Sequence, residues 1–226
     1  QVVLTMGLET GCFRFANKEG AQPNRVYSSA LAMVSGVSLG FFALMVVFAE
    51  PLAHLLGYDG YGSCMAYMGG ILALDSITAI LFAKLRQEHR AVKFAVFKTL
   101  KILVETGANI LLFFPFVSLC SRRAAALGVD VSALTPSDVW LLHFVSPTPD
   151  FSYVIFAILL SCIVCALLFI PDLVRLNFEF DGKLLRRMLV YSLPLMVAAL
   201  PGIVNDFLDR ILFRFLDTNA EQWQSS

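Results

Sequence analysis

The sequence has few charged residues and no excess of either sign. Only 15% of its 226 residues are charged, whereas a soluble domain usually has about 25%. Its 17 basic residues balance its 17 acidic residues, so the composition gives no indication of a nucleic-acid partner. With 58% hydrophobic residues and a mean hydropathy of +0.75, it is typical of a protein that crosses a membrane several times.

Cysteine is also scarce. There are five cysteines, and four of them lie in apolar runs, where a thiol acts as a small hydrophobic group. Cys162 and Cys165 form a CxxC within an apolar run, with no second pair and no neighbouring histidine. This pattern is not that of a zinc or redox site. We therefore expect no metal and no cofactor.

Long apolar runs dominate what is present. Crossing a bilayer takes about 20 mostly apolar residues, and residues 1–16 resemble the remaining part of such a span. Because the sequence begins with Gln1 inside an apolar run and ends in a polar tail at 217–226, we expect it to be a piece of a longer protein. Five complete spans are predicted at 27–49, 63–83, 94–118, 151–174 and 188–216.

Lysines and arginines predict how these spans are oriented. The connections after the first, third and fifth spans carry three, six and four of them, against four on the other side. The richer side is assigned to the cytoplasm, so the chain is predicted to start outside, cross six times and end outside. In the outer loop 120–150, Pro136 and Ser137 are expected to open a short helix, with Trp140 at the membrane interface.

The span 94–118 contains a polar stripe. Lys98, Lys101, Glu105 and Asn109 follow each other at steps of three and four residues, so they share one helix face. The stripe either lines a hydrated cavity or contains a Lys101–Glu105 pair that satisfies itself between packed helices. Asn109 lies deeper than such a pair needs, which favours the cavity.

Two other spans also contain ionisable residues, and ionisable groups at membrane depth usually face protein or water. Glu9 needs a basic partner, water or a proton, and Asp75 stands alone in ILALDSITAILF. Both are candidate ion-coupling sites. Arg14 either reaches the lipid headgroups or binds phosphate through the N–H groups of its planar guanidinium.

The last span contains NDFLDRILFRF. Asp206 and Arg210 are four residues apart and are predicted to pair, which makes a structural or gating role the leading interpretation. Asp206 and Asp209 also form a DxxD, a pattern found at metal–pyrophosphate sites, but no second aspartate-rich motif accompanies it. Pro194 and Pro201 predict that this span is kinked or interrupted.

Three stretches resemble one family. GLETGCFRFA with YSSAL, then LRQEHRAVKFAVFKTLKILVETGANILLFF, then LRRMLVYSLPLMVAALPGIVNDFLDRILFRFL are similar to helices two and three, five, and seven of bacterial polysaccharide-biosynthesis membrane proteins. These are lipid-linked oligosaccharide flippases of the multidrug/oligosaccharidyl-lipid/polysaccharide exporter superfamily. The resemblance implies an all-α fold of two bundles, of which this chain is most of the first.

The resemblance also implies a function without covalent chemistry, so the protein is not expected to be an enzyme. A polyprenyl-diphosphate-linked oligosaccharide would cross the bacterial inner membrane by alternating access, with membrane lipids, glycosyltransferases and a polysaccharide polymerase as partners. Arg14 and Arg25 would meet the diphosphate near the entrance, and Lys101, Glu105 and Asn109 would line the cavity. Asp209 and Arg210 match a characteristic pair of the family's seventh helix. Without the first helix and second bundle, this chain alone is not expected to transport.

Three alternatives stay open. A cation-coupled drug exporter of the same superfamily would use acidic cavity residues, and the basic entrance argues against it. A membrane-embedded prenyl or sugar transferase would need a second acidic cluster or a catalytic base on a re-entrant loop, and the sequence has neither. A non-transporting membrane scaffold would have intramembrane charges that pair with one another and are dispensable.

Overall fold

The computed structural model describes residues 2–17, 22–55, 62–127, 130–133, 152–174 and 179–224. Nearly all of these residues are helical and none forms a strand, which confirms the all-α prediction. The elements are α1 (Val2–Thr5), α2 (Leu8–Ala16), α3 (Pro23–Val47), α4 (Ala49–Leu55), α5 (Gly62–Gln87), α6 (Ala91–Leu111), the π-turn η1 (Leu112–Phe116), α7 (Val117–Leu127), the 3-10 turn η2 (Val131–Ala133), α8 (Ser152–Val174) and α9 (Gly182–Gln224).

Five stretches of helix in the described part of the chain are long and apolar enough to cross a membrane: 23–47, 62–87, 91–127, 152–174 and 182–202. Their outer surfaces carry large apolar side chains, with Val47 at 72%, Phe114 at 73% and Val190 at 67% exposed. Such faces suit contact with lipid. The chain is therefore a multi-pass membrane protein, and whether residues 1–16 belong to a sixth span stays a prediction.

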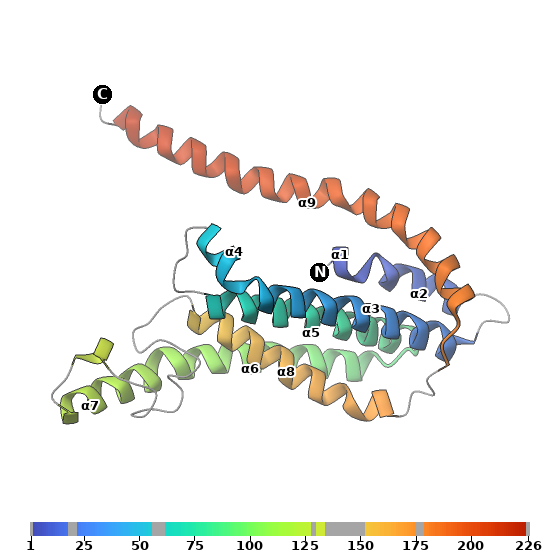
Figure 1. Ribbon diagram of the computed structural model, residues 1–226, viewed down its shortest axis with the longest axis horizontal. Helices are drawn as coiled ribbons and strands as arrows, with labels where there is room; N and C mark the ends of the chain where they lie inside the picture. The colour runs from blue at the N-terminus through green and yellow to red at the C-terminus, as the bar shows by residue number, and fades with distance from the viewer. Residues whose placement is uncertain are drawn as a thin grey trace.

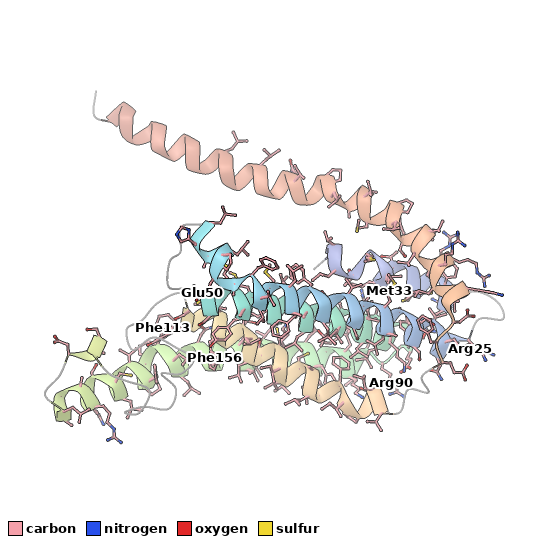
Figure 2. The ribbon with its side chains drawn as sticks, in the orientation of Figure 1. Arg25, Met33, Glu50, Arg90, Phe113 and Phe156 are labelled. Carbon is pink, nitrogen blue, oxygen red and sulfur yellow. The ribbon has the colours of Figure 1, made fainter. Side chains whose placement is uncertain are left out.

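Helix α5 lies at the centre of the packing. It contacts α3, α8 and α2, while α6 packs mainly on α8 and α9 packs on α2 and α3 (Figure 1). Arg25 and Arg90 lie at one end of the bundle, and Glu50, Phe113 and Phe156 lie towards the other (Figure 2). The connections rich in lysine and arginine thus meet at one end, as an up-and-down arrangement of consecutive spans requires.

The segment 1–16 is broken where a single helix was expected. Met6 and Gly7 have φ values of 49° and 66°, and this left-handed backbone separates α1 from α2. Gly7 also lies against α9, because a Cβ atom there would be 2.9 Å from the Ser192 carbonyl oxygen. The glycine therefore serves two purposes, namely the turn and the close approach of α9.

Replacing Gly7 with alanine should destabilise the protein by at least about 2 kcal/mol, because a left-handed residue with a Cβ costs roughly 1–2 kcal/mol and overpacking adds to that. Gly36→Ala is the matched control, since a Cβ at Gly36 meets nothing within 4 Å. Unfolding in mixed micelles measures both variants. Equal stability of the two variants would contradict the assigned role of Gly7.

The span predicted at 94–118 extends further, through η1 to Leu127. Pro115 lies in η1. Proline has no N–H, and its ring collides with the carbonyl one turn earlier. A π-turn accommodates both the missing N–H and the bulk of the proline ring without ending the helix. The helix expected in the loop 120–150 around Trp140 falls outside the described residues.

Helix α9 is continuous through Pro194 and Pro201, so the predicted span is not interrupted. It curves instead, and its C-terminal half runs apart from α3 and α4 (Figure 1). Its packed side chains lie near its start, where Leu185, Met188 and Ser192 are buried. Further along, Val197, Val204 and Leu208 are about half exposed or more.

Asp181 caps the start of α9. Its carboxylate accepts hydrogen bonds from the backbone N–H groups of Lys183 (2.9 Å) and Leu184 (3.1 Å). The bond from Leu184, with a further contribution from that of Lys183, lowers the pKa of Asp181 below its ordinary value of 3.8. The cap therefore favours folding above the ordinary pKa, and this contribution is lost as the pH falls through the lower folded pKa.

In Asp181→Ala, the Leu184 amide should exchange its hydrogen faster than in the wild type at neutral pH, because its acceptor is gone. The difference between the two proteins should shrink as the pH falls through the folded pKa of Asp181, which lies below 3.8. Hydrogen-exchange mass spectrometry over residues 182–190 measures this. A difference that does not change with pH would show that the carboxylate's charge is irrelevant to the cap.

Candidate functional site

An ion pair joins two predicted site residues within the membrane-spanning helices. Lys101 Nζ of α6 lies 2.5 Å from Asp75 Oδ1 of α5. The side chains are only 18% and 28% exposed, and the Cys162 thiol of α8 lies 3.4 Å from the same oxygen. Lys101 therefore pairs with the neighbouring helix rather than with Glu105 on its own helix.

A second ion pair involves Glu9, whose partner was an open question. Arg86 of α5 places a guanidinium nitrogen 3.7 Å from Glu9 Oε2 of α2. Sequence reasoning counted Arg86 only among the cytoplasmic charges. The position of Arg86, just after the predicted span 63–83 and within reach of membrane depth, is the feature of the sequence that indicates such a contact.

The two pairs border one cavity of about 420 Å³. Lys98 also lines it, and its ammonium lies 4.9 Å from the centre of the Phe82 ring. Three cations thus face two carboxylates, which leaves an excess of positive charge. Such an excess of positive charge favours an anionic ligand. The lining residues are Glu9, Asp75, Thr78, Ala79, Phe82, Arg86, Phe94, Lys98 and Lys101.

A second cavity, of about 500 Å³, shares Glu9 and Arg86 with the first. Its other lining residues are Thr10, Phe13 and Ala83, so it lies on the α2 side of the ion pair. The Glu9–Arg86 pair therefore stands where the two cavities meet. Both partners thus line the second cavity as well as the first.

The polar stripe of α6 is divided between two environments. Lys98 and Lys101 line the 420 Å³ cavity, whereas Glu105 and Asn109 are not among its lining residues. The Asn109 amide nitrogen donates to the Glu105 carbonyl oxygen at 3.1 Å. Asn109 Oδ1 is buried and has no hydrogen-bond partner in the described part of the chain. The prediction that Glu105 and Asn109 bind substrate stays a prediction.

The two predicted entrance arginines lie apart from that cavity. The Arg14 guanidinium lies over the Tyr191 ring of α9, 4.1 Å from its centre. Arg25 pairs with Glu179 and lines a separate cavity of about 710 Å³. That cavity is lined by Gln22, Pro23, Asn24, Arg25, Gln87, Glu88, Arg90 and Glu179, so its cations and carboxylates balance.

The structure does not test the predicted group in the last span. Asp206, Asp209 and Arg210 lie on the α9 backbone, but their side chains fall outside the described residues. Their pairing and the DxxD interpretation stay predictions. Within the described ranges, no three histidine, cysteine or acidic side chains come close enough to hold a metal ion.

Comparison with known proteins adds no relative. No protein family, curated protein or solved structure matches this chain.

Proposed function

We propose that the protein is a flippase that carries a polyprenyl-diphosphate-linked oligosaccharide across the bacterial inner membrane by alternating access. The observation that carries the proposal is the cavity between α5 and α6, whose three cations exceed its two carboxylates. A diphosphate supplies the missing negative charge and accepts hydrogen bonds from ammonium and guanidinium groups. The resemblance to lipid-linked oligosaccharide flippases supports the same substrate class.

In this mechanism Lys98 makes the first contact at the cavity, because its described interaction is with the Phe82 ring rather than with a carboxylate. Lys101 follows when the diphosphate replaces Asp75 as its partner. Since α6 rests mainly on α8, weakening the Asp75–Lys101 bond loosens the direct link between α5 and α6. Substrate binding thereby shifts the population between states open to either side.

The mutual pairing of Asp75 with Lys101 and of Glu9 with Arg86 favours a second candidate, a membrane scaffold without transport activity. In a scaffold these charges hold helices together and nothing enters between them. A cation-coupled drug exporter fits less well, because the excess charge of the cavity is positive.

The test uses the full-length protein reconstituted in proteoliposomes. We expect a fluorescent polyprenyl-diphosphate disaccharide to reach the far leaflet faster than in liposomes without protein. The same disaccharide on an uncharged polyprenyl lipid is the control and should not be accelerated. Equal rates with and without protein would exclude the flippase and leave the scaffold.

A further inference from the structure

The arginines at the cytoplasmic end differ in what they contact. Arg25, Arg86 and Arg90 form ion pairs with Glu179, Glu9 and Glu88. Within the described residues Arg14 has no carboxylate as an ion-pair partner, and its guanidinium lies on the Tyr191 ring instead. An arginine held by a ring face keeps the N–H groups at its edge free for a ligand.

The ring itself is held in place by α2. Phe15, the neighbour of Arg14, meets Tyr191 edge to face with ring centres 6.0 Å apart and planes at 69°. Two consecutive residues of α2 therefore contact one ring of α9. The aromatic contact fixes the ring, and the ring face fixes the guanidinium.

The contact depends on an unusually close approach of the two helices. A Cβ atom at Gly11 would lie 2.1 Å from Ser192 Oγ, and Ser192 is the neighbour of Tyr191 in α9. Only a residue without a side chain fits at that position unless the serine moves. Gly7, just before α2, and Gly11 within it both lie against Ser192, and this close approach brings Tyr191 within reach of Arg14.

We infer that Tyr191 is a positioning residue at an entrance site outside the 420 Å³ cavity, where it holds the Arg14 guanidinium so that its free edge binds a phosphate group of the lipid-linked substrate. The inference rests on the proposed function, which supplies the diphosphate. Bidentate binding needs the plane of the guanidinium to be fixed before the ligand arrives. Arg14→Lys would keep the positive charge but would lose the planar guanidinium and its stacking on the Tyr191 ring.

The test measures binding of farnesyl diphosphate to the full-length protein in phosphatidylcholine nanodiscs. Tyr191→Leu removes the ring, and Tyr191→Phe keeps it. We expect Tyr191→Leu to weaken binding about tenfold, and Tyr191→Phe to restore the affinity to within about twofold of the wild type. Val190→Ala, a truncation at the exposed neighbouring position, is the control and should bind as the wild type does.

A double-mutant cycle separates positioning from a general loss of packing. If Tyr191 acts through Arg14, then Arg14→Lys should weaken binding about as much as Tyr191→Leu, and the double variant should lose little more than either. Additive losses, or unchanged binding in Tyr191→Leu, would overturn the inference. The inference would also be overturned if the variants lost affinity for farnesyl diphosphate only in nanodiscs that contain phosphatidylglycerol. The phosphate bound by Arg14 would then belong to the membrane lipid.

The two proposals fail in different ways. If the wild-type protein binds farnesyl diphosphate no better than farnesol, the proposed function and this inference fail together. If the wild type prefers the diphosphate and the Tyr191 variants keep that preference, only the positioning role is wrong.

Discussion

Replacing Lys98 with methionine should slow transport of a polyprenyl-diphosphate disaccharide roughly tenfold or more. A hydrogen bond to a charged group contributes about 1.5–3 kcal/mol, and a tenfold change corresponds to about 1.4 kcal/mol. Lys98 is the most informative cavity residue to replace, because its described contact is with the Phe82 ring and not with a carboxylate. Its removal leaves no buried carboxylate behind, so the folded structure should persist.

Lys183→Met is the matched control, because Lys183 is an exposed lysine in the first turn of α9, outside the cavity lining. It should transport at the wild-type rate. Thermal unfolding of both variants in nanodiscs checks that neither has lost stability. If Lys98→Met transports normally at unchanged stability, the cavity does not carry the head group.

Replacing Lys101 with methionine should instead destabilise the protein by about 3 kcal/mol. Removing one partner of a buried ion pair typically costs about 3–5 kcal/mol, because the other charge loses its counter-charge. The side chains of this pair are 18% and 28% exposed, which places the expected cost near the lower end of that range. Unfolding in mixed micelles gives the free energy directly.

The double variant Asp75→Leu/Lys101→Met should recover most of that loss, to within about 1 kcal/mol of the wild type, since two apolar groups need no compensation. The 420 Å³ cavity beside the pair gives the new side chains room. A double variant as unstable as Lys101→Met would mean that lost packing, rather than an unpaired charge, causes the effect. Both the scaffold and the flippase predict this recovery of stability, but only the flippase predicts that the wild type transports and that the recovered double variant does not.

Much of the fold follows from the sequence because it depends on local properties. Apolar length alone located the helices around 27–49, 63–83 and 151–174, and the observed helices differ from these ranges mainly at their ends. The break at Gly7 was missed because a single glycine in an apolar run has several compatible backbone conformations. The extension of α7 to Leu127 was missed because hydropathy falls there while the helix continues.

The site was predictable only in part, for a different reason. Helix periodicity correctly placed Lys98 and Lys101 on one face, but periodicity compares residues within a single helix. The partner of Lys101 proved to be Asp75, 26 residues away on another helix. Likewise, the contact between Arg14 and Tyr191 joins α2 to α9, and no spacing in the sequence encodes it.

Photo-crosslinking shows directly where the substrate binds. Farnesyl diphosphate carrying a photoreactive benzophenone is irradiated with the full-length protein in nanodiscs, and the crosslinked peptides are identified by mass spectrometry. We expect crosslinks on the cavity side of α5 and α6, near Phe82 and Phe94, that unlabelled farnesyl diphosphate suppresses and Lys98→Met weakens. Crosslinks confined to exposed apolar residues outside the cavity lining, such as Ile102 and Leu103 at 60% and 61% exposed, would contradict the proposed binding site.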